Sequence, residues 1–211
     1  MAQSLQGKKV AALVAKGFEQ VELLKPRKAL EDAGAIVEVI SPEQGGSVRG
    51  WDMTDWGDDV DVDVQLNDAK PEEYDALLLP GGVKNPDILR TIPRAVQFVR
   101  DFFDAGKPIA AICHGPWTMV EADIVRGLHV TSWPSLKTDL TNAGANWTDE
   151  QVVVDRGIVT SRKPDDIPAF NDKMIEEFTE GQHGGAGKRE PSRQTRAAGA
   201  STGTARSTSS R

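Results

Sequence analysis

The sequence predicts an α/β protein with a mostly parallel sheet covered by helices on both faces. Short apolar segments alternate along the chain with longer stretches of helical character, several of which end at a glycine. The segments 9–15, 76–79 and 109–112 are apolar throughout, apart from Lys9 at the start of the first, and do not alternate with polar residues. This pattern is typical of strands that are buried on both faces of a parallel sheet.

The elements follow in order from apolar runs and their flanking residues. Pro26 should lie in the first turn of its helix or kink it. Residues 46–66 form an irregular excursion with hairpin character, because valines alternate with aspartates there. The predicted strands are 9–15, 36–40, 76–79, 109–112, 130–132, 152–154 and 158–160, and the predicted helices are 21–33, 93–105, 116–126 and 165–178.

Composition divides the chain of 211 residues into a short arm (1–8), one folded domain (9–180) and a basic tail (181–211). Hydrophobic residues make up 38% of the chain and charged residues 27%, as in ordinary globular proteins. The tail is rich in Gly, Ser, Thr, Ala and Arg and has no aromatic residue, Leu, Ile, Val or Met. We expect it to be disordered, because it cannot bury enough apolar surface to offset its ordering entropy.

Charge and cysteine content limit the classes of function. The net charge is −7, with +5 in the tail and −12 in the rest, so nucleic acid is not expected as the main partner. The chain has one cysteine and cannot form an intramolecular disulfide. No apolar leader or membrane-length apolar run is present, and we therefore expect a cytoplasmic protein without membrane association.

The strongest candidate for chemistry is Cys113, which follows the apolar strand 109–112 and precedes His114-Gly115-Pro116. A sharp strand-to-helix turn exposes one side chain, as in a nucleophile elbow. Amides at a helix N-terminus lower the pKa of a nearby thiol, which predicts a reactive thiolate. The alternative is a buried core cysteine, since free cysteines are often buried.

Three loops should meet beyond the carboxyl ends of the strands, at residues 16–22, 81–87 and 113–116. His114 is a candidate general base or substrate contact. Glu19 and Glu22 are three residues apart on a helical turn, and either could reach the thiol, although an acidic first turn also simply favours the helix dipole. Gly82 ends a buried strand, where glycine lets backbone amides approach a ligand as an oxyanion hole requires.

No metal or organic cofactor is expected. The aspartates at residues 52–63 do not have the glycine and glutamate spacing of an EF-hand, and they are better explained as the solvent face of a strand. No Cys/His cluster has zinc spacing. The sequence also has no phosphate-binding Walker loop and no dinucleotide fingerprint.

Together these segments resemble the PfpI family of intracellular cysteine hydrolases, within the class I glutamine-amidotransferase-like superfamily. The resemblance runs from about residue 9 to residue 178. Its motifs are GFEQVE at 17–22, YDALLLPGG at 74–82, AAICHGP at 110–116, NAGA at 142–145, VVVD at 152–155 and TSRKPDDIPAF at 160–170. Two features depart from the family pattern: the loop between Gly82 and Asp87 is a residue longer than in some relatives, and Trp117 replaces a common glutamine.

The resemblance implies a flavodoxin-like sandwich that forms homodimers or larger rings. It implies that Cys113 is the nucleophile, that Glu22 contacts its sulfur and that Glu19 lines the same pocket. Backbone amides of Gly82 and His114 would form the oxyanion hole. In ring-forming members an acidic residue reaches the histidine of a neighbouring subunit, and Asp87 would take that role here.

Three functions remain open at this point. The first is a glyoxalase or deglycase that acts on reactive dicarbonyls or glycated groups and attacks an aldehyde through Cys113. The second is a cysteine peptidase, in which His114 must be oriented by an acid such as Asp87. The third is a redox sensor or chaperone that needs an oxidisable thiol but no turnover.

Overall fold

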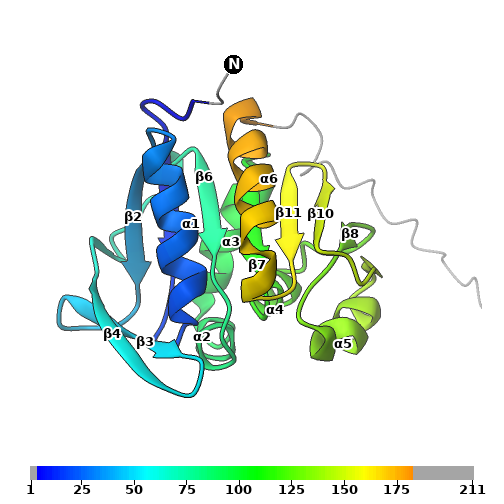
Figure 1. Cartoon of the computed structure of the whole chain (residues 1–211), viewed down its shortest axis with the longest axis horizontal. Coiled ribbons are helices and arrows are strands. Elements are labelled where there is room, and N and C mark those ends of the chain that lie inside the picture. The colour runs from blue at the N-terminus through cyan, green and yellow to red at the C-terminus, as the bar shows by residue number, and fades with distance from the viewer. Residues whose placement is uncertain (1–3, 183–211) are drawn as a thin grey trace, which may run out of the picture.

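A seven-stranded sheet with strand order β10-β11-β7-β6-β1-β2-β5 forms the centre of the molecule (Figure 1). The computed structural model describes residues 4–182. All neighbours in the sheet pair in parallel except the edge strand β10, which is antiparallel to β11. The strands of this sheet are β1 (Lys9–Leu13), β2 (Ile36–Ser41), β5 (Val64–Gln65), β6 (Ala76–Leu79), β7 (Ile109–Ile112), β10 (Val152–Asp155) and β11 (Ile158–Ser161).

Helices lie on both faces of this sheet, as the sequence predicts. The first face carries α1 (Gln20–Asp32) and α6 (Ile167–Glu180), which pack on alternate residues of the central strands. The opposite face carries α3 (Pro93–Asp104), together with α4 (Pro116–Glu121) and α5 (Lys137–Asn142). This layered arrangement confirms the flavodoxin-like α/β fold expected from the motifs.

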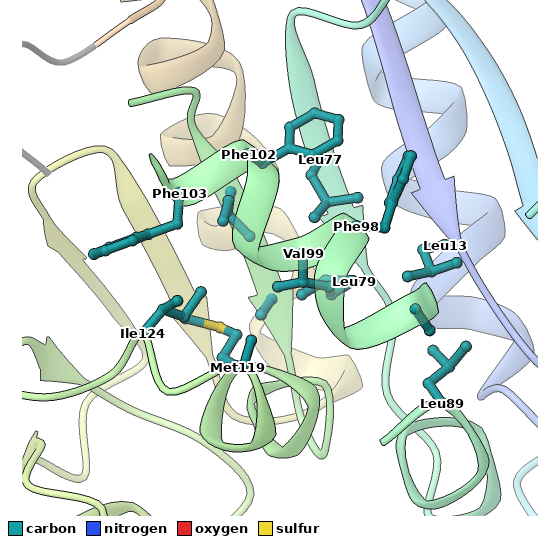
Figure 2. Close-up of a cluster of buried hydrophobic side chains, with 14 of the residues drawn as sticks. Leu13, Leu77, Leu79, Leu89, Phe98, Val99, Phe102, Phe103, Met119 and Ile124 are labelled. Carbon is teal, nitrogen blue, oxygen red and sulfur yellow. The ribbon is translucent and has the colours of Figure 1, made fainter. Parts of the chain in front are cut away.

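The larger buried cluster lies beneath α3. Phe98, Val99 and Phe102 of α3 point onto Leu77 and Leu79 of β6 (Figure 2). Phe98 and Phe102 also contact each other, with ring centroids 5.2 Å apart. Because helix and strand side chains are buried together here, the cluster fixes the carboxyl ends of β6 and β7 relative to each other.

Two smaller strand pairs lie outside the main sheet. The first is the antiparallel hairpin of β3 (Ser47–Asp52) and β4 (Asp55–Asp61), which confirms the hairpin expected in residues 46–66. The second is the parallel pair of β8 (His129–Val130) and β9 (Asn146–Trp147). Short 3-10 turns occur at Pro71–Glu73, Pro134–Leu136 and Pro164–Asp166.

The helices differ from the prediction in three respects: the position of Pro26, the end of α4 and the presence of two further short helices. Pro26 lies inside α1 beyond its first turn, where it cannot donate a hydrogen bond to the carbonyl of Glu22. Helix α4 ends at Glu121, before the predicted residue 126, because Asp123 has a left-handed backbone with φ 52°. The sequence analysis missed two six-residue helices, α2 (Lys84–Leu89) and α5.

Within residues 4–182, no helix is long and apolar enough to cross a membrane. The tail that the sequence predicts to be disordered lies outside the described residues from 183 onward.

Candidate active site

Cys113 lies directly after β7, on the turn that leads into α4. Its φ is 61°, in the left-handed region that non-glycine residues rarely adopt. Its amide donates to the carbonyl of Ser161 at 3.0 Å, and its carbonyl accepts from the amide of Trp133 at 2.9 Å. These bonds hold the strained turn in place, and such strain is typical of functional sites.

Glycines make this turn possible through close packing. A Cβ on Gly115 would lie 2.5 Å from the carbonyl oxygen of Leu79. A Cβ on Gly81 would lie 2.7 Å from the Cβ of Cys113. No side chain fits at either distance. The ends of β6 and β7 therefore approach so closely that only glycine is tolerated beside the sulfur.

Glu22 is fully buried beside the cysteine, in the first turn of α1. Its Oε2 accepts a hydrogen bond from the amide of Gly81 at 2.9 Å, and its carboxyl also interacts with the sulfur of Cys113. The second oxygen, Oε1, has no other partner among the described residues. Burial, reinforced by the charge of Glu19, raises the pKa of Glu22 to about 8, so this carboxyl is mostly protonated at neutral pH.

The thiol itself has a raised pKa, which is opposite in direction to the lowered value that the sequence led us to expect. Burial is the main cause, and the neighbouring Glu22 adds to it. The amides of Gly82 and His114 donate to the sulfur and lower the pKa of the thiol, but they do not outweigh its burial. The resting form is therefore the thiol, and a base must accept its proton during attack.

His114 is the neutral base that contacts the thiol of Cys113 and can accept its proton. Its Nδ1 lies 3.2 Å from the sulfur of Cys113, and its Nε2 lies 3.4 Å from Oγ of Ser135. The ring is stacked on Trp133, with centroids 6.0 Å apart, and has an edge contact with Trp117. Burial lowers the pKa of His114 to about 4, so the imidazole is neutral at pH 7 and can accept a proton.

Glu19 lies just before α1 and lines the same cavity as Cys113. Its Oε1 accepts from the amide of Met53 at 3.3 Å, which ties the β3–β4 hairpin to the site. Burial is the largest cause of its raised pKa, to which Asp52 adds, while the Met53 hydrogen bond acts in the other direction.

These groups open onto one cavity of about 510 Å³. It lies beyond the carboxyl ends of the strands, where the three candidate loops were predicted to meet, and residues of all three loops line it. Its volume falls in the range of about 300–1,000 Å³ that is typical of small-molecule sites. The lining residues are Gly17, Glu19, Glu22, Trp51, Met53, Gly82, Val83, Lys84, Cys113, His114, Trp133 and Pro164.

The structure thus brings together Cys113, His114, Glu19, Glu22 and Gly82, but not Asp87. Asp87 is exposed on α2 and does not line the cavity. In this single chain Ser135, and not an acid, contacts Nε2 of His114. Contact with His114 of a neighbouring subunit stays a prediction.

The sequence analysis missed several residues of this site. Asn85 is buried beneath the Pro80-Gly81 turn, where its Oδ1 accepts from the amide of Ala15 at 2.7 Å and its Nδ2 donates to the carbonyl of Pro80 at 2.8 Å. An amide side chain next to the Pro-Gly-Gly turn was the available signal. The cavity walls formed by Trp51, Met53 and Trp133 had no such signal, because they come from separate segments.

Among residues 4–182, no group of three or more His, Cys, Asp or Glu side chains is arranged to hold a metal ion. The aspartates of the hairpin region instead point to solvent, as expected for the polar face of a strand.

Comparisons with known proteins agree with this geometry. The model of the DJ-1/PfpI family matches residues 8–177. "Putative cysteine protease YraA" of Bacillus subtilis is 44% identical over 168 residues, which cover 80% of this chain and 96% of that protein. "Protein/nucleic acid deglycase 2" of Escherichia coli is 44% identical over 169 residues, which cover 80% of this chain and 96% of that protein.

A solved structure agrees as well. It is a two-domain protein from Anabaena variabilis with DJ-1/ThiJ/PfpI-like and ferritin-like domains, and it superimposes with a TM-score of 0.76 at 34% identity. The match covers 88% of this chain and 51% of that one, so the chain spans about half the length of the two-domain protein.

Proposed function

The chain belongs to the DJ-1/PfpI family, and from this premise and the geometry of the site we propose that it is a cysteine-dependent enzyme that acts on reactive dicarbonyls or glycated groups. One observation carries the proposal. The Cys113 sulfur lies on a left-handed turn, contacts two backbone amides and a protonated carboxyl, and opens onto a small-molecule cavity. A relative named as a protein/nucleic acid deglycase supports the same substrate class.

The proposed reaction with methylglyoxal begins when Nδ1 of His114 accepts the thiol proton and the sulfur attacks the aldehyde carbon. The oxyanion accepts hydrogen bonds from the amides of Gly82 and His114 and takes the proton of Glu22, which gives a hemithioacetal and leaves Glu22 as a carboxylate. This carboxylate accepts the proton of the aldehyde carbon and delivers it to the neighbouring carbonyl carbon through an enediol, and a thioester results. Water hydrolyses the thioester to lactate and restores the thiol.

This proposal is tested by incubating the full chain with methylglyoxal and following both reactant and product by NMR. We expect lactate to appear in the same molar amount as the methylglyoxal that is lost, without added metal or cofactor. Methylglyoxal that persists, or that disappears without lactate, would contradict the proposal. Aggregation of a heated client protein, followed in parallel, reports any chaperone function that does not require turnover.

Peptidase activity is the second candidate, and it has a stricter requirement. An amide needs a protonated leaving group, which demands a histidine that is oriented and stabilised as a cation. His114 has no acidic partner among the described residues, and its pKa is lowered to about 4 by burial. We therefore propose peptide cleavage only for an assembly in which Asp87 of a neighbouring subunit reaches His114.

Replacing Asp87 with alanine tests this assembly. If peptide cleavage is present, we expect it to fall at least about a hundredfold, because the acid of a triad holds the histidine and stabilises its cation. Asp104→Ala removes an exposed carboxylate elsewhere on the surface and serves as the control. If both variants cleave the peptide equally fast, the hypothesis of a cross-subunit triad is ruled out. Light scattering measures the oligomeric state and shows whether the subunits associate.

A further inference from the structure

Lys84 is the cationic side chain among the described residues that line the cavity. It lies at the start of α2, and its ammonium is 4.4 Å from the ring centre of Trp56 and 5.3 Å from that of Trp51. No carboxylate of residues 4–182 forms an ion pair with it. Contacts with aromatic rings attract a cation without neutralising its charge, so Lys84 still has the capacity to bind an anion.

The stem of Lys84 is held as well as its ammonium. A Cβ on Gly17 would lie 2.9 Å from Cβ and 3.0 Å from Cδ of Lys84, so the stem packs directly against the Gly17 backbone. Gly17 has a φ of 82°, which favours glycine at this position. Lys84 is an exposed residue, but its contacts with the Gly17 backbone and two tryptophan rings restrict its side chain, so it loses less conformational freedom on binding a ligand than a lysine without such contacts does.

The cavity walls around this positive charge are mostly apolar, because Trp51, Met53, Val83 and Trp133 line it. Of the two cavity carboxyls, Glu22 is mostly protonated at neutral pH because burial raises its pKa to about 8, and burial also raises the pKa of Glu19. Attraction between opposite charges is stronger beside apolar walls than in open water.

The cavity is also larger than a small dicarbonyl requires. Its volume of about 510 Å³ suits a ligand of drug-like size, whereas methylglyoxal has a backbone of only three carbons. Space therefore remains for a group attached to the reacting carbonyl, and Lys84, Trp51 and Trp133 are among the residues that line the cavity.

We propose that Lys84 is a specificity-determining residue that binds an anionic group, so that preferred substrates carry a carboxylate or a phosphate next to the reacting carbonyl or glycated group. This inference rests on the proposed function, because it concerns the substrates of the same cysteine. The two anions share the chemistry that Lys84 recognises, and the experiment distinguishes them.

The first test needs no turnover. Iodoacetate and iodoacetamide have similar size and differ in charge, and both alkylate Cys113: the sulfur–carbon bond forms, the carbon–iodine bond breaks, iodide leaves and the thiol proton passes to solvent. We expect the ratio of the iodoacetate rate to the iodoacetamide rate to fall by about threefold to fivefold in Lys84→Gln, because a nearby charge raises the encounter rate of an anion. A change in thiol pKa affects both reagents and cancels in the ratio.

Lys16→Gln is the matched control. The ammonium of Lys16 lies 5.1 Å from the ring centre of Trp56, but Lys16 does not line the cavity. Its ratio is expected to equal that of the wild type. An unchanged ratio in Lys84→Gln, or an equal fall in both variants, overturns the inference.

The second test uses pairs of methylglyoxal adducts that differ by one charged group. Guanosine monophosphate and guanosine form the phosphate pair, and N-acetylcysteine and its amide form the carboxylate pair. In Lys84→Gln we expect kcat/KM to fall roughly tenfold for the anionic member of at least one pair and less than about twofold for its neutral member. The pair that responds identifies the anion.

The outcomes separate the two claims. If the wild type converts neither methylglyoxal nor any of the adducts, the proposed function fails, and if it converts methylglyoxal alone, the proposed function stands. In both cases the alkylation ratio alone decides the role of Lys84. If the wild type processes the adducts but Lys84→Gln changes neither pair selectively, the inference fails and the proposed function stands.

Discussion

Cys113→Ala is expected to abolish methylglyoxal conversion, with a loss of at least about a thousandfold in kcat/KM, because no other nucleophile takes the place of the sulfur. Cys113 is the one cysteine of the chain, so no other thiol can substitute for it. The measurement is lactate production by NMR, with circular dichroism to verify that the variant is folded.

Cys113→Ser is the matched control for this loss. The hydroxyl retains nearly the size of the thiol and accepts hydrogen bonds from the amides of Gly82 and His114, which contact the sulfur in the wild type. It is a much weaker nucleophile than the thiol, so we expect the serine variant to be nearly as inactive as the alanine variant. Methylglyoxal conversion that survives in either variant would eliminate the proposed reaction.

The same variants separate enzyme from chaperone. If Cys113→Ala loses lactate production but still prevents client aggregation, the two properties are independent, and the thiol serves only the chemistry. If both are lost while the fold is intact, the protective property depends on the thiol, as a redox sensor requires.

The sheet was predictable because its signal is local. Strand β7 coincides with the predicted residues 109–112, and β6 coincides with the predicted residues 76–79. Continuous apolar runs bounded by glycine and proline leave few alternatives for such segments. Helix α2 was missed because its six residues, Lys84–Leu89, contain a proline and are too short to show a helical period.

The site was predictable in its members but not in its electrostatics. A cysteine before His-Gly-Pro and a Pro-Gly-Gly turn are local features, and the parallel sheet brings them to one edge. The protonation states depend on burial, which residues distant in sequence create. Met53 of the hairpin, Trp133 after β8 and Pro164 before α6 all line the cavity that contains the thiol. Helix-end reasoning alone therefore gave the wrong direction for the pKa of the thiol.

Glu22→Gln is expected to stabilise the folded protein at alkaline pH while it impairs catalysis. Burial raises the pKa of Glu22 from 4.5 to about 8 in the folded state. Between these values the unfolded chain releases the proton and the folded chain retains it, so the wild type loses stability as pH rises through this interval. Above about pH 8 the full penalty applies, which amounts to roughly 4 to 5 kcal/mol at most.

Glutamine preserves the shape of the protonated acid without this penalty. Its carbonyl oxygen can accept from the amide of Gly81, as Oε2 of Glu22 does, and its NH₂ group can donate toward the sulfur. Urea unfolding at pH 4.5 and at pH 8 should therefore show similar stabilities at the lower pH and a more stable variant at the higher pH. Lactate production should fall at least about a hundredfold, because glutamine cannot carry a proton.

Glu31→Gln is the control for this comparison, since Glu31 is an exposed residue of the same helix, α1. Its stability difference from the wild type should change by less than about 0.5 kcal/mol between the two pH values, because the partly exposed Arg27–Glu31 ion pair that it removes contributes little. A Glu22→Gln variant that is less stable than the wild type at pH 8, or that differs from it equally at both pH values, would mean that Glu22 is ionised in the folded protein. The proton relay between the carboxyl and the substrate would then have to begin from a carboxylate, and Glu22 would compete with His114 for the thiol proton.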